Sequence, residues 1–413
     1  MLANQIHEIF KNSNLKEIIN ILETNGAKVR LVGGIVRDFY LNKKLNLISD
    51  IDLVTNFDPK KVLEICEKNN ISAFLLNENY GTVCIKLSKH QYEITSLRSD
   101  IKNYGRHAKI QIHDDWDLDA RRRDFTFNAI YLDIRGNKFD PFDGIKDLEN
   151  GIVKFIGDPN LRIQEDYLRI LRYVRFYAIY SKNNKNNIII NILKKYVSKI
   201  NLLSLERITK EIKLIFSLPQ IKFLKALNVM KLSNIAYAIF GNKIKTDKLL
   251  KYIKIVNKVK YSPKSNWLIR IALITNESFQ ICENISLSKK EKFFWEDIRS
   301  EITHEQYKTL NSSEWKKGAI LFKKQSLIKF ILYSVNFNEP NYNRMLELKN
   351  YKEPLFPING EDLIKKGLKP SKEIGLSLEY LKSLWIQSNF SLNKDQLIDK
   401  LNNKIIFNHY DKP

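Results

Sequence analysis

Cysteine is scarce in this chain of 413 residues, which has only Cys66, Cys84 and Cys282, far apart in the sequence. No CxxC pair and no cluster of Cys with His occurs, which argues against a structural zinc site and a disulfide framework. No apolar run approaches the roughly 18 residues of a membrane-spanning helix. The N-terminal segment also lacks the unbroken apolar core of a signal peptide. These absences predict a soluble, cytoplasmic protein.

Glycine and proline are also few, with 14 and 10 residues, and no stretch rich in them marks a linker between domains. No internal repeat is evident, and no His-Asp metal motif occurs, so we expect no appended phosphohydrolase activity. The apolar fraction of 44% and the aromatic fraction of 11% are ordinary for a globular protein. They exclude a chain that is disordered throughout.

Basic residues are in large excess, with 69 Lys and Arg against 46 Asp and Glu, a formal net charge of +23. Residues 1–140 hold 21 basic and 19 acidic residues, whereas residues 141–413 hold 48 and 27. An AT-rich coding sequence would also enrich the chain in Lys, but it would spread the excess more evenly. We therefore expect a polyanionic partner, most commonly nucleic acid, along the C-terminal two-thirds.

The first 140 residues are predicted to mix strands with helices. Alternating or continuous apolar residues predict strands at 28–32, 48–55, 82–87, 91–97 and 125–134. The third and fourth of these strands are close enough in sequence to form a hairpin. Asp58 and Pro59 are typical of a helix N-cap and first helical position, which predicts a helix to about residue 68.

From about residue 147 onward the periodicity is helical. Apolar residues three and four apart predict helices at 163–181, 206–217, 219–231 and 246–259, and Ser204 is a candidate N-cap for the second. Residues beyond 260 are interpreted as a basic helical body, in which no site is identified. The predicted fold class is α+β, with a head at 1–140, a helical neck at 141–260 and a helical body or tail at 261–413.

Two carboxylates, Asp50 and Asp52, flank Ile51 on a predicted strand. Side chains two residues apart on a strand point to the same face. Neighbouring carboxylates repel unless a cation lies between them, and hard oxygen ligands suit Mg²⁺. An isolated DxD is more often a solvated strand face. Glu93, on the next predicted strand, is either a third oxygen ligand or an exposed strand residue.

Gly33 and Gly34 lie between a predicted strand and a predicted helix. Paired glycines let backbone N–H groups approach a phosphate closely, although a lone pair of glycines is usually only a turn. Here Arg37 and Asp38 follow on the first helical turn, and Asp50 arrives a dozen residues later. A phosphate cradle next to a divalent-cation site is what nucleoside triphosphate chemistry requires.

Four charged residues, Glu165, Asp166, Arg169 and Arg172, are three and four apart and would share one face of the helix predicted at 163–181. Alone, this pattern favours a surface salt-bridge ladder. Asp only accepts hydrogen bonds and Arg only donates them. Cytosine and adenine each present an amino donor beside a ring-nitrogen acceptor, whereas uracil and guanine present the opposite order. An Asp166–Arg169 pair would therefore accept C and A and reject U and G.

Several segments, in the same order, resemble the class II tRNA nucleotidyltransferase and bacterial poly(A) polymerase family. The segment LVGGIVRDFYL, followed by SDIDLVT, is similar to the head of that family. The segment LRSDIKNYGRHA is similar to the family's flexible loop region. The segment RRRDFTFNAIYLD is similar to the motif that contacts the sugar and the phosphates. The head-to-neck connection is similar to FDPFDGIKDLENGIVKFIGDP, the nucleotide-selecting helix to EDYLRILRYVRFYA, and the next neck motif to LSLERITKEI. The resemblance covers roughly residues 28–215, about half of the chain.

The resemblance implies a polymerase-β-like nucleotidyltransferase head followed by an all-helical neck and body. It implies that Asp124 contacts the ribose and that two of Arg121, Arg122 and Arg123 hold the triphosphate. Asn128 either supports the nucleotide pocket or has a structural role at a strand edge. The expected nucleotide-binding residues are Gly33, Gly34, Arg37, Asp38, Arg122, Arg123, Asp124, Asn128, Glu165, Asp166, Arg169 and Arg172.

The resemblance further implies addition of C, C and A to the 3′ end of tRNA from CTP and ATP. Two Mg²⁺ ions are expected on Asp50 and Asp52, with Glu93 as a helper, and the basic body is expected to hold the tRNA backbone. Alternatives are a poly(A) polymerase, an enzyme that adds only CC or only A, and an inactive RNA-binding relative. The hairpin at YGTVCIKL lacks the basic Gly-Arg-Arg-Phe-like element expected of the first, and the apparently full loop at 98–120 argues against a CC-only enzyme. An inactive relative would be expected to have lost Asp50, Asp52 or Glu93, and all three are present.

Overall fold

The computed structural model divides into two compact units, one of Met1–Ile244 with Ser278–Leu287 and one of Lys245–Glu277 with Ser288–Pro413. The structure describes residues 13–41, 51–77, 81–87, 90–104, 107–182, 187–241, 244–263, 266–275, 279–300, 304–321, 326–337, 340–368 and 372–401. The division into a neck at 141–260 and a body at 261–413 stays a prediction.

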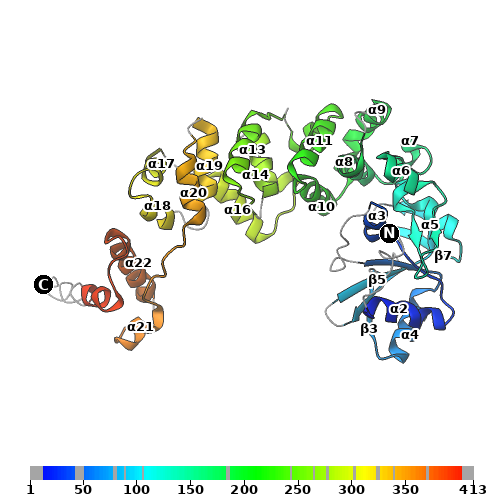
Figure 1. The fold of residues 1–413 in the computed structure, drawn as a ribbon, viewed down its shortest axis with the longest axis horizontal. Coiled ribbons are helices and arrows are strands. Elements are labelled where there is room, and N and C mark those ends of the chain that lie inside the picture. The colour runs from blue at the N-terminus through cyan, green and yellow to red at the C-terminus, as the bar shows by residue number, and fades with distance from the viewer. Residues whose placement is uncertain are drawn as a thin grey trace. The chain divides into compact units, whose positions relative to one another are not determined.

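A seven-stranded sheet forms the centre of the head, with strand order β3-β4-β5-β2-β1-β8-β9. Two of its strands, β3 and β5, are labelled in Figure 1. The strands are β1 (Val29–Leu31), β2 (Ile51–Thr55), β3 (Ser72–Asn77), β4 (Thr82–Leu87), β5 (His90–Ser96), β8 (Tyr131–Leu132) and β9 (Lys138–Phe139). Only β2 and β5 run parallel, and the other neighbours are antiparallel. The predicted β4–β5 hairpin is confirmed, and it places β5 directly beside β2.

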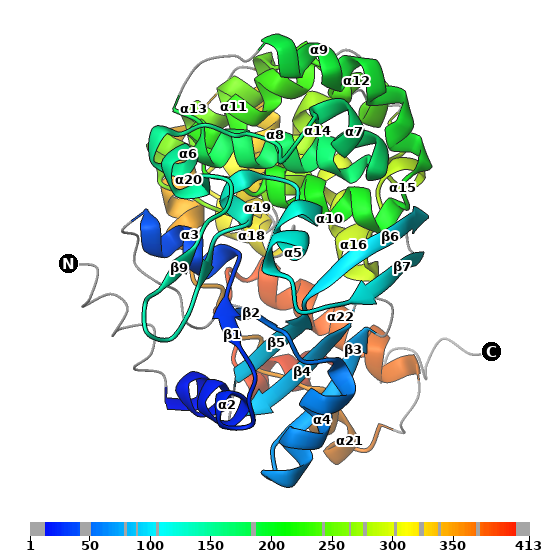
Figure 2. The ribbon, with the colours of Figure 1, turned by 90° about the vertical axis from the view of Figure 1, so that its right-hand side faces the viewer.

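Helices and a separate β-ribbon complete the head. They are α2 (Ser13–Thr24), α3 (Gly34–Tyr40), α4 (Pro59–Lys68), α5 (Trp116–Arg122), β6 (Arg98–Tyr104) and β7 (His107–Ile112). The predicted start of α4 is confirmed, because the Asp58 side chain accepts a hydrogen bond from Lys61 N and Pro59 is the first helical residue. The loop expected at 98–120 contains the antiparallel ribbon β6–β7, which lies beside α5 (Figure 2).

The strand predicted at 125–134 is mostly wrong. Phe125 forms an isolated bridge with Phe155, a 3₁₀ turn (η2) spans Thr126–Asn128, and only Tyr131–Leu132 pair as a strand. Asn128 Nδ2 donates to Asp124 Oδ1 at 2.7 Å, a contact that four residues of extended chain, about 13 Å long, could not make. Every residue from Asp124 to Leu132 is buried, so the apolar run could not distinguish a strand from a turn.

Helices make up the rest of the first unit. They are α6 (Gly144–Asn150), α7 (Pro159–Glu165), α8 (Leu168–Tyr180), α9 (Asn187–Tyr196), η3 (Val197–Leu202), α10 (Leu205–Phe216), α11 (Gln220–Leu232), α12 (Ile235–Phe240) and α15 (Ile281–Asn284). The predictions for α10 and α11 are confirmed to within about a residue at each end. Ser204 does precede α10, but its side chain makes no capping hydrogen bond.

The single helix predicted at 163–181 is wrong, because the chain breaks into α7 and α8 at Asp166. Asp166 has an extended backbone, with φ −153° and ψ 105°. Its Oδ1 accepts a hydrogen bond from Leu168 N at 3.1 Å, which is the side-chain behaviour that lets Asp begin a helix rather than continue one.

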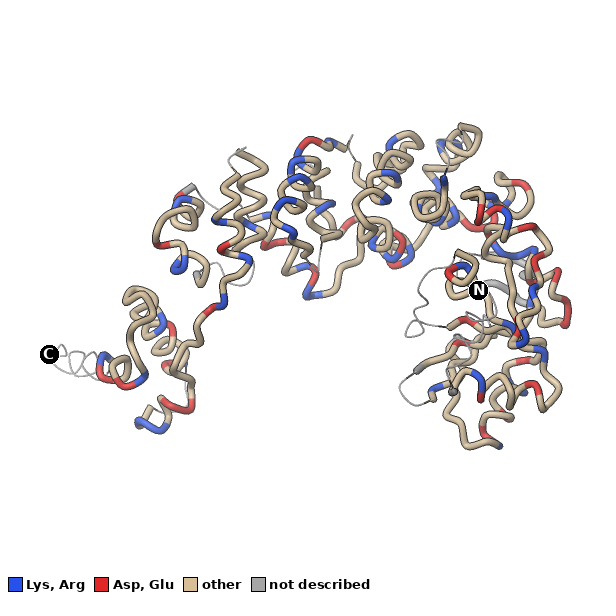
Figure 3. Tube along the Cα trace, in the orientation of Figure 1, with Lys and Arg blue, Asp and Glu red and all other residues tan. Residues whose placement is uncertain are grey.

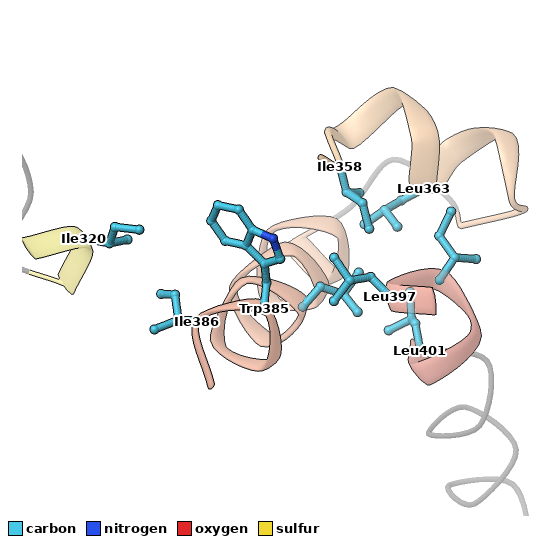
Figure 4. Packing of buried hydrophobic residues seen from close by; sticks show 9 residues of the cluster. Ile320, Ile358, Leu363, Trp385, Ile386, Leu397 and Leu401 are labelled. Carbon is cyan, nitrogen blue, oxygen red and sulfur yellow. The ribbon is translucent and has the colours of Figure 1, made fainter. Parts of the chain in front are cut away.

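The second unit is helical, as predicted. Its helices are α13 (Asp247–Val259), α14 (Asn266–Ile274), α16 (Lys289–Arg299), α17 (His304–Asn311), α18 (Trp315–Leu321), α19 (Ser326–Phe337), α20 (Tyr342–Asn350), α21 (Gly360–Lys365), α22 (Lys372–Gln387) and a further helical stretch at 394–401. A buried cluster that includes Leu363, Trp385 and Leu397 packs the last three of these helical stretches together (Figure 4).

The helix α13 shows how basic residues are arranged in this unit. Lys251, Lys254 and Lys258 are exposed, three and four residues apart, whereas Tyr252 and Ile255 are buried. Figure 3 marks Lys and Arg in blue along the backbone trace. The lysines therefore follow the solvent face of an amphipathic helix. Among the described helices of the chain, none is long and apolar enough to cross a membrane.

Candidate active site

A pocket of about 420 Å³ lies in the first unit. Its lining comes from the Gly33 turn and α3, from β2, from the end of α5 and the segment after it, and from the break before α8 and α8 itself. The lining residues are Gly33, Gly34, Arg37, Asp52, Arg122, Arg123, Asp124, Asn128, Asp166, Arg169, Arg172, Arg175 and Phe176. The structure thus brings together residues that the sequence analysis had taken from four separate motifs.

Three predicted site residues lie outside this lining, and a fourth is not among the described residues. Asp38, Glu93 and Glu165 do not belong to the lining as far as the described residues define it. Asp50 falls outside the described residues, so its place stays a prediction.

The turn at Gly33 brings the backbone against Asp52. Gly33 has φ +79° and ψ −133°, a conformation that residues with a side chain rarely adopt. A Cβ placed on Gly33 would lie 2.7 Å from Asp52 Oδ2, which is too close for any real contact. Val32 N also donates to Asp52 O at 3.1 Å. The glycine is therefore required so that this carboxylate can lie against the start of α3.

Glu93 is the partner of Asp52 in the parallel pairing of β2 with β5. Residues in register on neighbouring strands present their side chains to the same face, so two hard oxygen donors lie next to each other on this face of the sheet. Asp52 is exposed and Glu93 is half-buried. Within the described part of the chain, no group of three or more Asp, Glu, His or Cys is close enough to hold a metal.

Asp119, on α5, anchors two arginines of the pocket. Its fully buried carboxylate accepts hydrogen bonds from Arg122 Nη2 at 2.6 Å, Arg123 Nη2 at 3.0 Å and the Tyr131 hydroxyl at 2.7 Å. Burial alone would raise its pKa, but the Arg123 and Arg122 guanidiniums outweigh burial and hold that pKa far below the usual range. Of the three consecutive arginines, Arg122 and Arg123 face the pocket, whereas Arg121 is exposed.

Asp124 connects the head to α8. Its Oδ2 accepts from Arg172 Nε at 2.6 Å, and its Oδ1 accepts from Asn128 Nδ2. Burial opposes ionisation of this carboxylate, but the Arg172 guanidinium outweighs it and lowers the Asp124 pKa to about 2. Asn128 in turn accepts a hydrogen bond from Arg37 through its Oδ1. Asn128 therefore bridges Arg37 and Asp124 from η2 and not from the edge of a strand, and its part in nucleotide binding stays a prediction.

Asp166 and Arg169 lie at the start of α8. Arg169 is 7% exposed; its Nη1 donates to Arg162 O at 2.7 Å and to Glu165 Oε2 at 2.6 Å, and its Nη2 donates to Arg122 O at 3.1 Å. Because the chain breaks at Asp166, neither Glu165 nor Asp166 belongs to the helix face of α8 that carries Arg169 and Arg172. Glu165 holds Arg169 from outside the pocket instead.

Two lining residues, Arg175 and Phe176, were not predicted. Arg175 Nε donates to Glu211 Oε2 at 2.6 Å, and the Phe176 ring centroid lies 4.2 Å from the Arg175 guanidinium carbon. The same ring lies 5.3 Å from that of Arg37 and 5.2 Å from that of Arg172. Both missed residues continue the three- and four-residue spacing from Arg172 along α8, and extending that pattern by one turn would have found them.

Six arginines and three aspartates line the pocket. This excess of fixed guanidinium groups suits the phosphate oxygens of a triphosphate, which Arg binds through paired N–H donors. Asp166 and Arg169 add an acceptor and a donor suited to the edge of a base. A mixed sheet with a carboxylate beside a Gly-Gly turn, followed by such a pocket, defines the class of polymerase-β-like nucleotidyltransferases.

Comparison with known proteins agrees with that class. The profile of the Poly A polymerase head domain matches residues 29–154. The mitochondrial CCA tRNA nucleotidyltransferase 1 of Danio rerio is 28% identical over 97% of this chain and 93% of the relative. The CCA-adding enzyme of Lactobacillus helveticus is 28% identical over 92% of this chain and 94% of the relative.

Solved structures share the fold. The Bacillus stearothermophilus CCA-adding enzyme in complex with CTP matches with a TM-score of 0.65 and 20% identity, over 96% of this chain and 98% of that one. The Thermotoga maritima enzyme complexed with tRNA matches with a TM-score of 0.62 and 19% identity, over 98% of each chain. These matches support the resemblance, found in the sequence, to the class II CCA-adding tRNA nucleotidyltransferase and bacterial poly(A) polymerase family.

The likeness to nucleotidyltransferases implies use of a divalent metal. The residues present fit such an ion. Gly33 has no Cβ, and this leaves a space beside the turn in which the Asp52 carboxylate lies. Glu93 brings a second carboxylate to the same face of the sheet through its register with Asp52. Oxygen donors of this kind suit a hard cation rather than a soft one.

Proposed function

We propose that this chain adds C, C and A, in that order, to the 3′ end of tRNA from CTP and ATP. The 3′-hydroxyl oxygen attacks the α-phosphorus, a new phosphodiester bond forms, and the bond to the β-phosphate breaks to release pyrophosphate. The observation that carries this proposal is the presence of Asp166 and Arg169 in the same pocket as Asp52 and the arginines. The names of the relatives in Danio rerio and Lactobacillus helveticus support it.

Base selection follows from the hydrogen bonds that Asp166 and Arg169 have left to make. Each Asp166 oxygen already accepts one hydrogen bond from the protein, which leaves one lone pair on each for the amino group of C or A. Arg169 uses both Nη1 hydrogens and one on Nη2, which leaves an Nε hydrogen and one Nη2 hydrogen for the base ring nitrogen. U and G would leave these groups unpaired, which costs binding free energy.

The triphosphate is held by the arginines of the pocket, namely Arg37, Arg122, Arg123 and Arg172. Asp119 fixes Arg122 and Arg123 in place before the nucleotide arrives, so little side-chain entropy is lost on binding. Asp124 Oδ2 keeps a lone pair beside its bond to Arg172, and that lone pair accepts from a ribose hydroxyl.

Asp52, Asp50 and Glu93 would hold Mg²⁺. When bound there, Mg²⁺ would lower the pKa of the attacking hydroxyl and would stabilise the charge of the leaving pyrophosphate. The residues of the chain supply the remainder of the catalysis by holding the base, the sugar and the phosphates in a fixed geometry.

The tRNA backbone binds along the neck and body, where exposed lysines such as those of α13 offer a sequence-independent and salt-sensitive contact. We also propose a cytoplasmic location, although the relative in Danio rerio is named as mitochondrial. A poly(A) polymerase is the second candidate, since the profile that matches the head carries that description.

Extension of a radiolabelled tRNA that lacks its 3′ CCA tests the proposal. We expect two additions with CTP alone, a third when ATP is also present, and then a stop. Long A tails with ATP alone would instead identify a poly(A) polymerase. As a control, Asp52→Ala is expected to abolish transfer and to leave tRNA binding nearly intact, and equal activity in this variant would disprove the metal assignment.

A further inference from the structure

The neck motif LSLERITKEI has no part in the function proposed above, yet its Arg207 contacts Asp166, one of the residues that line the pocket. Arg207 lies in the first turn of α10, and its Nη2 donates to Asp166 Oδ2 at 2.8 Å. Arg207 is absent from the residues that line the pocket as described, so it reaches the Asp166 carboxylate from behind. This ion pair joins α10 to the break between α7 and α8.

The carboxylate of Asp166 is held from two sides. Leu168 N donates to Oδ1 at 3.1 Å, and Arg207 donates to Oδ2 at 2.8 Å. One hydrogen bond would leave the carboxylate free to rotate about its own bond, whereas two bonds to different oxygens fix the plane of the group. The lone pairs that remain on Asp166 then point in one direction, as recognition of a base edge requires.

Arg169 does not depend on Arg207. It is held by Glu165 and by the carbonyl oxygens of Arg162 and Arg122. Loss of Arg207 would therefore displace the acceptor half of the pair and leave the donor half in place. A displaced Asp166 would no longer oppose the carbonyl oxygen that uracil presents where cytosine has its amino group.

We propose that Arg207 is a positioning residue that sets the choice of base by fixing Asp166. This inference rests on the proposed function, since it assumes that Asp166 and Arg169 contact the incoming base. A purely structural salt bridge is the competing explanation. The side chains of Arg207 and Asp166 are 28% and 29% exposed, and pairs that are partly exposed contribute little to stability. The two explanations therefore predict different effects on stability and on base choice.

The test compares Arg207→Gln, Arg207→Lys and Lys210→Gln. Lys210 is exposed one turn further along α10, so its variant removes the same charge from the same helix without touching Asp166. Single-turnover kcat/KM is measured for addition of CMP and of UMP to tRNA lacking CCA, and Tm is measured for each variant. We expect Arg207→Gln to lower the CMP-to-UMP ratio by about tenfold, the factor equivalent to about 1.4 kcal/mol.

Arg207→Lys keeps the charge and one donor, so it is expected to retain more of the ratio than Arg207→Gln, and Lys210→Gln is expected to retain all of it. An equal fall in both kcat/KM values, with the ratio unchanged, would show a structural role and overturn the inference. A wild-type protein that adds UMP as readily as CMP would overturn the proposed function as well. If the wild type prefers CMP and Arg207→Gln has the same CMP-to-UMP ratio, this inference alone would be overturned.

Discussion

Replacement of Gly33 by alanine should damage the active site far more than it damages the fold. The backbone at Gly33, with φ +79° and ψ −133°, is unfavourable for a residue with a side chain, at a cost of about 1–3 kcal/mol. The new Cβ would also lie 2.7 Å from Asp52 Oδ2, so the carboxylate must move by several tenths of an ångström or more. Misplacement of a reacting group by about 1 Å can reduce the rate about a hundredfold. We expect a loss of that size in single-turnover CMP addition.

Gly241→Ala is the matched control for backbone strain. Gly241 ends α12 with φ +71°, and a Cβ there would meet nothing within 4 Å. We expect this variant to lose about 1 kcal/mol of stability in urea and to keep its transfer rate. The reasoning would be refuted if the two variants transferred CMP at similar rates, because the contact between Gly33 and Asp52 would then have no functional consequence.

Three further predictions concern two buried carboxylates and Phe176, the aromatic residue that lines the pocket. Asp119→Ala should lower the free energy of unfolding by about 3 kcal/mol, since it leaves two buried guanidiniums without their shared partner; urea unfolding measures this, and a loss near zero would contradict it. Asp124 has a folded-state pKa of about 2 against an ordinary 3.8, so its contribution of about 2 kcal/mol is complete above pH 4 and is lost as the pH falls towards 2. Between pH 2 and pH 5, the free energy of unfolding should accordingly depend less steeply on pH in Asp124→Asn than in the wild type. Phe176→Leu should raise KM for CTP more than it lowers kcat, because three guanidiniums lose their common ring face.

The sequence was sufficient for features that depend on local spacing. The Gly33 turn, the start of α4 at Asp58 and the β4–β5 hairpin each follow from residues within a short window, and each is confirmed. The pairing of Asp52 with Glu93 across the sheet could also be predicted, because strand alternation places both on one face once β2 and β5 are adjacent.

Features that depend on tertiary partners could not be predicted in this way. The break at Asp166 requires a carboxylate that caps Leu168 and is held by Arg207 from α10, and helical periodicity continues straight through that position. The turn at Thr126–Asn128 is buried on all sides, so its apolar run resembles a strand. Asp119 was missed because an acidic residue on a short helix is ordinarily exposed, and only its pairing with Arg122, Arg123 and Tyr131 explains its burial.

The carbonyl oxygen of Arg122 has a consequence for protein engineering. It accepts hydrogen bonds from both Arg162 and Arg169, while the Arg122 side chain lines the same pocket. Any substitution that relocates Arg169 to suit another base also removes a support from the backbone of Arg122, for which we propose a role in phosphate binding. Libraries that vary positions 166 and 169 alone should therefore yield enzymes with altered base choice and poor turnover, and recovery of turnover should require simultaneous variation around positions 122 and 123.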